Sequence, residues 1–234
     1  MSSPLINFLL PSHCIICNKV LDSDAQICPD CFNKLNFISK PYCKKCGHPF
    51  LDGQDGEFCG FCIKNKKDVL NISRSVSVYD EVSKKMIIDF KFFDKTQNIK
   101  VFGKWLKIAG ADIFANNIDV IIPVPLHFFR LLKRKYNQAG LLAKEIGKIE
   151  NVLVDYTSLK KKKYTKPQTK FSLKVRQHNV KNSFIIKDCQ NIKDKKVLLI
   201  DDVMTTGSTL RECARVLLKA GAKEVNVLTL ARVL

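Results

Sequence analysis

Two adjacent carboxylates and a run of small hydroxyl residues carry the clearest chemistry in this sequence. Asp201 and Asp202 directly follow a short apolar run, 197–200, and are soon followed by five small residues: Thr205, Thr206, Gly207, Ser208 and Thr209. Backbone N–H groups and hydroxyls of such a loop bind anions where the loop opens a helix. This order of strand, acidic pair and loop predicts a ligand that carries hydroxyl groups next to a phosphate.

A second candidate for anion binding follows the apolar run 119–125. The run ends at Pro125, and the next residues include Leu126, His127, Arg130, Lys133, Arg134 and Lys135. Guanidinium groups bind phosphate oxygens in a fork, so a cationic turn after a strand favours a diphosphate site. The alternative is the solvated start of a basic helix. The proline pair and Asn137–Gln138 favour the diphosphate site only in combination with the acidic pair.

Residues 160–187 form a basic segment with ten Lys or Arg residues and no Asp or Glu. A run of like charge is usually solvated. Between two strands of an α/β domain, the same run can instead form a lid over an anionic substrate or contact a nucleic-acid backbone. The residues alone leave these three alternatives open.

Eight of the ten cysteines form CxxC pairs before residue 63: Cys14/Cys17, Cys28/Cys31, Cys43/Cys46 and Cys59/Cys62. Two intervening residues let one turn direct both sulfurs at one ion, and two such turns complete a tetrahedral S₄ shell that suits zinc. The pairs therefore predict two closed, structural zinc sites. Sequential pairing is favoured over an interleaved pairing, because residues around 37–41 have the character of a connector between two units.

Strand and helix patterns alternate from residue 119 onward, which predicts an α/β domain with a parallel sheet and a ligand at the carboxyl ends of its strands. We expect strands at 75–79, 119–125, 152–159, 197–200 and 224–230. We expect helices at 81–93, 101–114, 139–148 and 208–220, with Lys84, Lys85 and Lys91 on a solvated face of the first. The domain boundary is placed after residue 68, giving a cysteine-rich domain 1–68 and an α/β domain 69–234.

The composition limits the class of protein. A hydrophobic content of 46% is that of a folded chain, and a net charge of +18 favours phosphate-rich partners, although a lysine-rich proteome explains the excess equally well. No apolar stretch approaches the roughly 18 residues of a membrane span. The first residues make a poor signal peptide. These observations predict a cytoplasmic protein without a membrane span.

The stretch VLLIDDVMTTGST, residues 197–209, resembles the phosphoribosyl-diphosphate signature of type I phosphoribosyltransferases. Nearly the full chain resembles the ComF family, named for its role in competence for DNA uptake. Four features coincide in order: the CxxC pairs, PVPLH with Arg130, Arg134 and Asn137–Gln138, TKPQ followed by Arg176 and Asn179–Val180, and the signature. The resemblance implies an α/β type I phosphoribosyltransferase fold preceded by a double zinc-ribbon domain.

The resemblance also implies a role for each matching residue. Asp201 and Asp202 would bind the ribose hydroxyls, and residues 205–209 would enclose the 5-phosphate of phosphoribosyl diphosphate (PRPP), which is bound with Mg²⁺. The diphosphate would lie near Pro125, Leu126, His127, Arg130 and Arg134, and Lys163 would belong to a flexible basic hood loop, 160–187. The family commonly has Arg at Lys163, and Lys keeps the charge but not the fork.

Two functions follow as hypotheses. The first is an enzyme that transfers the phosphoribosyl group to a nitrogen nucleophile. The second is a protein that handles incoming single-stranded DNA through the 160–187 segment, with a regulatory phosphoribosyl diphosphate site. In either case the zinc domain could dock DNA-uptake or recombination proteins.

Overall fold

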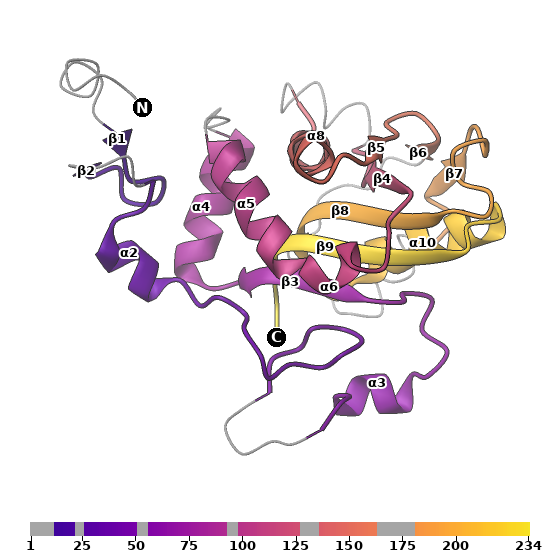
Figure 1. The fold of residues 1–234 in the computed structure, drawn as a ribbon, viewed down its shortest axis with the longest axis horizontal. Coiled ribbons are helices and arrows are strands. Elements are labelled where there is room, and N and C mark those ends of the chain that lie inside the picture. The colour runs from indigo at the N-terminus through magenta and orange to yellow at the C-terminus, as the bar shows by residue number, and fades with distance from the viewer. Residues whose placement is uncertain (1–11, 22–25, 51–55, 93–97, 127–135, 163–180) are drawn as a thin grey trace.

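The computed structural model describes residues 12–21, 26–50, 56–92, 98–126, 136–162 and 181–234. Its centre is a five-stranded parallel sheet with the strand order β3-β9-β8-β4-β5 (Figure 1). The strands are β3 (Ser73–Val78), β4 (Val120–Pro123), β5 (Leu153–Val154), β8 (Lys196–Met204) and β9 (Glu224–Arg232). The predicted α/β class with a parallel sheet is confirmed.

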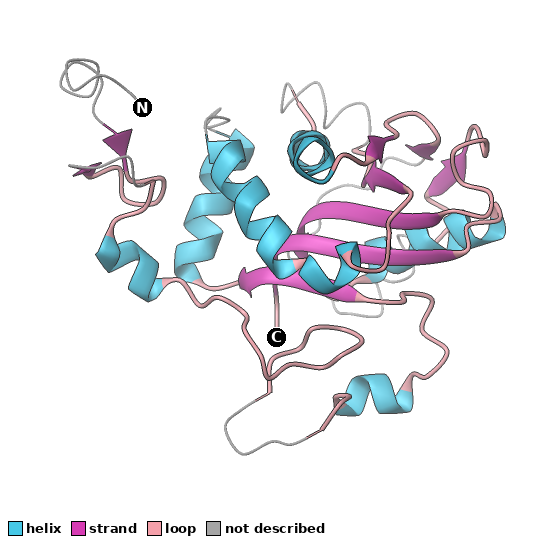
Figure 2. Cartoon of the chain, in the orientation of Figure 1, coloured by secondary structure: helices cyan, strands magenta, loops and turns pink. Residues whose placement is uncertain are grey.

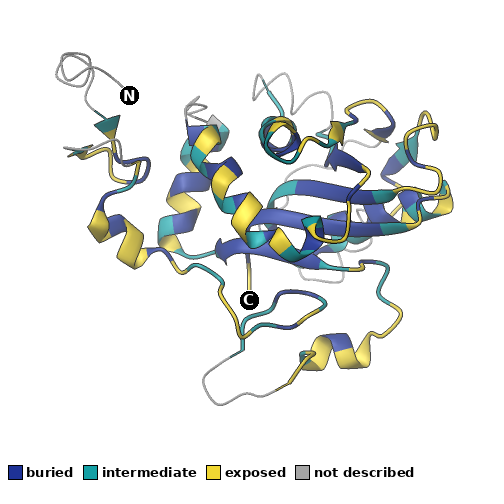
Figure 3. Ribbon diagram, in the orientation of Figure 1, coloured by how far each residue is buried: buried dark blue, intermediate teal, exposed yellow. Residues whose placement is uncertain are grey.

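Helices cover both faces of this sheet, because β8 is apolar on both sides (Figures 1 and 2). Leu198 and Ile200 pack in one core cluster with α4 (Glu81–Phe92), α5 (Ile99–Ala109) and α8 (Gln138–Glu150). Val197 and Leu199 pack in a second cluster with α10 (Ser208–Lys219). Figure 3 shows the resulting buried sheet between partly exposed helices. None of the described helices has the length and apolar character that crossing a membrane requires.

Two expected elements differ from the structure. The expected strand 152–159 is wrong as one element, because Asp155 accepts hydrogen bonds from the backbone N–H groups of Thr157 (2.8 Å) and Ser158 (3.0 Å) and so forms a turn. The chain therefore makes short β5 and then β6 (Leu159–Lys161), which pairs antiparallel with β7 (Phe184–Ile186). The expected helix 101–114 is interrupted at Gly110, which separates α5 from α6 (Ala111–Phe114).

The cysteine-rich region consists of two short units built in the same way. The first four-cysteine unit, residues 12–21 and 26–35, contains β1 (Ser12–His13), β2 (Val20–Leu21) and α2 (Pro29–Lys34). The second four-cysteine unit, residues 41–50 and 56–67, contains α3 (Gly60–Lys64). In Figure 1 the first unit lies beside α4, whereas the second lies below β3 near the C-terminus.

Candidate functional site

The acidic pair lies within β8 rather than beyond its end, because the strand continues from the expected end at Ile200 to Met204. Asp202 lies toward α4, where its Oδ2 atom is 2.8 Å from the Nζ atom of Lys91. Asp201 precedes Asp202 on the strand and is near enough to α10 to raise the pKa of the buried Cys213. Both carboxylates are affected by Lys91, which is paired with Asp202 and lowers the pKa of Asp201.

The pKa of Asp201 is raised well above that of an ordinary carboxyl group. Burial and then the charge of Asp202 raise its pKa to about 7, against the opposing effects of the Asp202 backbone N–H and of Lys91 and Lys161. The Asp202 N–H donates to Asp201 Oδ1 over 2.9 Å. A carboxyl group with this pKa is partly protonated at neutral pH, so it can donate as well as accept a hydrogen bond. This property suits the recognition of hydroxyl groups.

The small-residue loop ends at the N-terminus of the 12-residue helix α10. Gly207 has a left-handed backbone with φ +71°, which L side chains rarely adopt. The hydroxyl oxygens of Thr206 and Ser208 are 2.8 Å apart, and the Ser208 N–H donates to Thr206 Oγ1 over 3.3 Å. The loop thus collects hydroxyls and the first N–H groups of a helix at one point, as an anion site requires.

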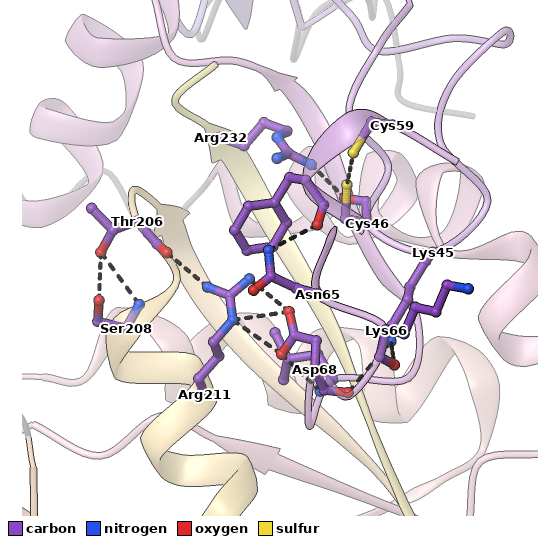
Figure 4. Close-up of polar contacts among 12 residues, drawn as sticks. Lys45, Cys46, Cys59, Asn65, Lys66, Asp68, Thr206, Ser208, Arg211 and Arg232 are labelled. Atoms are coloured by element: carbon purple, nitrogen blue, oxygen red, sulfur yellow. Dashed lines mark hydrogen bonds and ion pairs between the residues drawn. The ribbon is translucent and has the colours of Figure 1, made fainter. Parts of the chain in front are cut away.

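Arg211 connects this loop to the cysteine-rich region (Figure 4). Its Nη1 atom donates to Thr206 O over 2.8 Å, and its Nε and Nη2 atoms donate to the carboxylate of Asp68 over 2.8–3.0 Å. Its guanidinium lies over the Phe61 ring of α3, 5.1 Å from the ring centre. One side chain therefore contacts the small-residue loop 205–209 (below called the phosphate loop, after its expected ligand), Asp68 just after the second four-cysteine unit, and that unit itself.

Of the predicted diphosphate residues, Pro125 and Leu126 lie within the described part of the chain. They line a cavity of about 380 Å³ together with Tyr156 and Lys161. Lys161 is also near enough to Asp201 to affect its pKa, so the cavity lies beside the acidic pair. The other predicted residues of this set, His127, Arg130, Arg134 and Lys163, lie outside the described residues.

Asn137 and Gln138, which the sequence linked to the diphosphate turn, bind backbone instead. Asn137 Nδ2 donates to Val124 O and Gln138 Nε2 donates to Lys91 O, both over 3.2 Å. Gln138 is fully buried at the start of α8. These amides therefore hold the end of β4 and the end of α4 in place around the acidic pair.

Three cations near the site, Lys91, Lys161 and Arg211, were not among the predicted site residues. The expectation that Lys91 lies on a solvated helix face is wrong, because it is 18% exposed and paired with Asp202. Its position within the apolar run 90–93 was the available signal. Lys161 was part of the basic segment without a role of its own. No local sequence pattern marks Arg211 as a site residue, because its partner Asp68 is 143 residues away in the chain.

The cysteine sulfurs form two separate groups of four, which fit zinc. Cys14, Cys17, Cys28 and Cys31 form one group and Cys43, Cys46, Cys59 and Cys62 the other, with all sulfurs of a group within 4.8 Å of one another. Zn–S bonds of about 2.3 Å place the sulfurs of a tetrahedral shell roughly 3.8 Å apart. The Cys17–Cys28 and Cys46–Cys59 sulfurs are 3.7 and 3.5 Å apart. The sequential pairing is confirmed.

The backbone of each unit favours thiolate at its first cysteine. Burial alone would raise the pKa of Cys14, but the N–H groups of Cys17, Cys28 and Ile16 outweigh it and lower this pKa to about 6. The pKa of Cys43 is lowered in the same way, to about 7. Asn18 and Gly47, which follow the first CxxC of each unit, both have positive φ and complete the same tight turn. Thiolates held by backbone N–H groups are suited to a structural metal.

The cysteine-rich region and the α/β domain each match a known protein family. Residues 5–63 match the family model "Double zinc ribbon domain" and residues 91–234 match "Phosphoribosyl transferase domain". Competence protein F of Haemophilus influenzae is 33% identical over 94% of this chain and 96% of its own length. Competence protein ComFC of Bacillus subtilis is 29% identical over 91% of this chain and 87% of its own. DNA utilization protein YhgH of Escherichia coli K12 is 25% identical over 94% and 90%.

Proposed function

The chain belongs to the ComF family, and from this premise we propose that it binds phosphoribosyl diphosphate with Mg²⁺ and transfers or otherwise uses the phosphoribosyl group. The observation that carries the proposal is the acidic pair of β8, followed directly by the loop at the N-terminus of α10. Ribose hydroxyls and a 5-phosphate are the kinds of group that carboxylates and the loop at a helix N-terminus bind.

In this proposal each part of the ligand has its own partners. Asp201 and Asp202 bind the 2- and 3-hydroxyls, and residues 205–209 bind the 5-phosphate. The diphosphate and its Mg²⁺ are assigned to Pro125 and Leu126, and to four residues outside the described part of the chain: His127, Arg130, Arg134 and Lys163. Lys91, which is paired with Asp202, and Lys161, which lines the cavity with Pro125 and Leu126, are additional cations at the site. The half-protonated state of Asp201 supports the hydroxyl assignment, because one partner hydroxyl can then accept a hydrogen bond.

The chemistry of transfer needs no protein nucleophile. A nitrogen acceptor attacks the anomeric carbon, the bond from that carbon to the diphosphate oxygen breaks, and its electron pair leaves with the diphosphate. The acceptor nitrogen then loses its proton. Positive charge grows on the ribose ring near the acidic pair, and negative charge grows near the cations and Mg²⁺. Fixed charges that are complementary to both lower the barrier.

The relatives suggest the biological setting. Two are named competence proteins and a third a DNA utilization protein. We therefore propose a role in DNA uptake, with DNA-uptake or recombination proteins as partners of the zinc domain. The cytoplasmic location and the domain boundary after Asp68 remain predictions within this proposal.

A second candidate is the handling of single-stranded DNA. The observation that favours it is the charge of the β6–β7 hairpin, where Lys160, Lys162, Lys181 and Lys187 are exposed. Because phosphate contacts release counterions, such binding would weaken steeply with salt. Filter binding of a labelled single strand at several salt concentrations tests it, and an absence of salt-dependent binding contradicts it.

The main proposal is tested by calorimetric titration with phosphoribosyl diphosphate and Mg²⁺. We expect binding by the wild type and a loss of roughly 100-fold or more in the variant Asp201→Asn/Asp202→Asn, since two charge-assisted contacts are removed. Release of diphosphate in the presence of nitrogenous acceptors then distinguishes transfer from binding alone. A wild type that does not bind the ligand contradicts the proposal.

A further inference from the structure

The second four-cysteine unit is joined to the phosphate loop through Arg211. Figure 4 shows this side chain between Thr206 on one side and Asp68 on the other. Its guanidinium also lies over the Phe61 ring. The ion pair with Asp68 is largely shielded, with side-chain exposures of 21% for Arg211 and 9% for Asp68. Shielded charges that fix each other in a fork geometry define position better than exposed ones.

The loop side of this contact is equally restricted. A Cβ atom on Gly207 would lie 2.5 Å from Arg211 Nη1 and 2.9 Å from Met204 Cε. The loop backbone and the guanidinium are therefore packed against each other. Arg211 Nη1 also satisfies the carbonyl of Thr206, which keeps that peptide unit in a single orientation. A fixed peptide orientation sets the direction of the N–H group that follows it.

Helix α3 connects the metal site of the second unit to Arg211. This helix has only five residues, which is too short to be stable on its own. Cys59 precedes it and Cys62 lies within it, so a zinc ion would hold both ends of the turn that carries Phe61. The Asp68 N–H donates to Asn65 O over 3.0 Å at the end of the same unit, which fixes the other partner of Arg211.

We propose that Arg211 is a positioning residue for the phosphate loop, and that metal binding by the second four-cysteine unit controls the affinity of this loop for a phosphate monoester through Phe61 and Asp68. This inference rests on the proposed ligand site. It assigns the second unit a part in ligand binding, in addition to its part in folding.

Variants at two positions separate positioning from a simple effect of charge. Arg211→Gln removes both the contacts and a positive charge near the phosphate. Asp68→Asn removes the ion pair but leaves the site more positive. If Arg211 acts by position, both variants weaken binding of ribose 5-phosphate and of phosphoribosyl diphosphate, by roughly tenfold. If charge alone matters, Asp68→Asn binds as well as or better than the wild type, which overturns the proposal.

Arg215→Gln is the matched control. Arg215 lies one turn further along α10, is 58% exposed on its side chain and pairs with Glu212 rather than with the loop. The Arg215→Gln variant loses the same positive charge as Arg211→Gln. We expect unchanged affinity in this variant, and an equal loss in both glutamine variants overturns the proposal.

A ligand-free measurement separates this inference from the proposed function. Hydrogen–deuterium exchange of a peptide covering residues 203–209 reports the order of the loop directly. We expect faster exchange in Arg211→Gln and Asp68→Asn, and wild-type exchange in Arg215→Gln. If the wild type does not bind the phosphoribosyl ligands, the proposed function fails while this result still decides the positioning role. Unchanged exchange in all three variants overturns it.

Discussion

The two four-cysteine units share their metal chemistry but are attached to the α/β domain in opposite ways. The first unit is attached through aromatic rings: Phe32 lies 5.3 Å from Phe37, and Phe37 lies 5.3 Å from Trp105 of α5. The second is attached through arginines from three elements of the domain. The same ligand spacing therefore does not imply the same role, because the role depends on what the unit contacts.

The arginines that hold the second unit are largely buried. Arg74 of β3 is 4% exposed, and its Nη2 atom donates to Lys44 O over 2.8 Å. Arg232 of β9 is 8% exposed and donates to Cys46 O. Arg211 adds the contact with Phe61. These cations lie next to a thiolate cluster that carries net negative charge with zinc bound, so they also stabilise it electrostatically.

The largest expected difference between the units is in ligand binding after loss of one metal. We expect Cys62→Ser, in the second unit, to weaken binding of phosphoribosyl diphosphate by roughly 100-fold, since a structural zinc supplies much of the folding energy of such a unit. We expect Cys31→Ser, in the first unit, to bind within about twofold of the wild type, an ordinary effect of a change away from a site. Calorimetry gives the affinities.

Metal analysis supplies the control for this pair. Each variant should retain one zinc per chain, compared with two in the wild type, as the two groups of four cysteines imply. An equal loss of affinity in the two variants would show that the units do not differ in role. Much less than two zinc ions in the wild type would contradict the double zinc ribbon itself.

The next largest effect is expected from the loop side of the contact. Gly207→Ala places a Cβ atom against Arg211 and forces a left-handed residue, which costs about 1–2 kcal/mol. We expect roughly tenfold weaker binding of ribose 5-phosphate, measured by calorimetry. Gly60→Ala is the matched control, because no atom of the described residues lies within 4 Å of its added Cβ. Equal affinities in these two variants would contradict a restricted loop.

A different effect, on stability rather than on binding, is expected at the first unit. Phe37→Ala removes a ring between Phe32 and Trp105 and should lower the free energy of unfolding by about 2–3 kcal/mol, at or below the range for buried aromatic residues. Its affinity for the ligand should not change. Denaturant unfolding measures the first quantity and calorimetry the second. A loss of affinity would remove the contrast between the units.

The last effect concerns pH and neither unit directly. The pKa of Asp201 is about 7 in the folded chain and near its usual 3.8 in the unfolded chain. Between these values the folded state binds more protons, so Asp201 lowers stability as pH rises through this range. Asp201→Asn should remove this part of the pH dependence. Thermal unfolding from pH 5 to 8 checks it, and parallel curves for variant and wild type would contradict the raised pKa.

Local patterns allowed prediction of much of the fold and part of the site. Runs of apolar residues indicated the sheet, and CxxC spacing indicated both metal sites. The acidic pair and loop were found because they are adjacent in sequence. The contacts of Lys91 with Asp202 and of Arg211 with Asp68 depend on which elements meet in space, and no local periodicity encodes that. The turn at Asp155 was missed because its hydrogen bonds outweigh the strand preference of the neighbouring residues.

The position of β9 between β3 and β8 has a consequence for the order of assembly during synthesis. Ser75 of β3 shares a hydroxyl contact with Thr229 of β9, a residue 154 positions later. Both four-cysteine units emerge from the ribosome long before β9 does, and they can capture metal at once. The Arg211 and Arg232 contacts form only after α10 and β9 have emerged. The second unit therefore completes its metal site early and acquires its influence on the phosphate loop last.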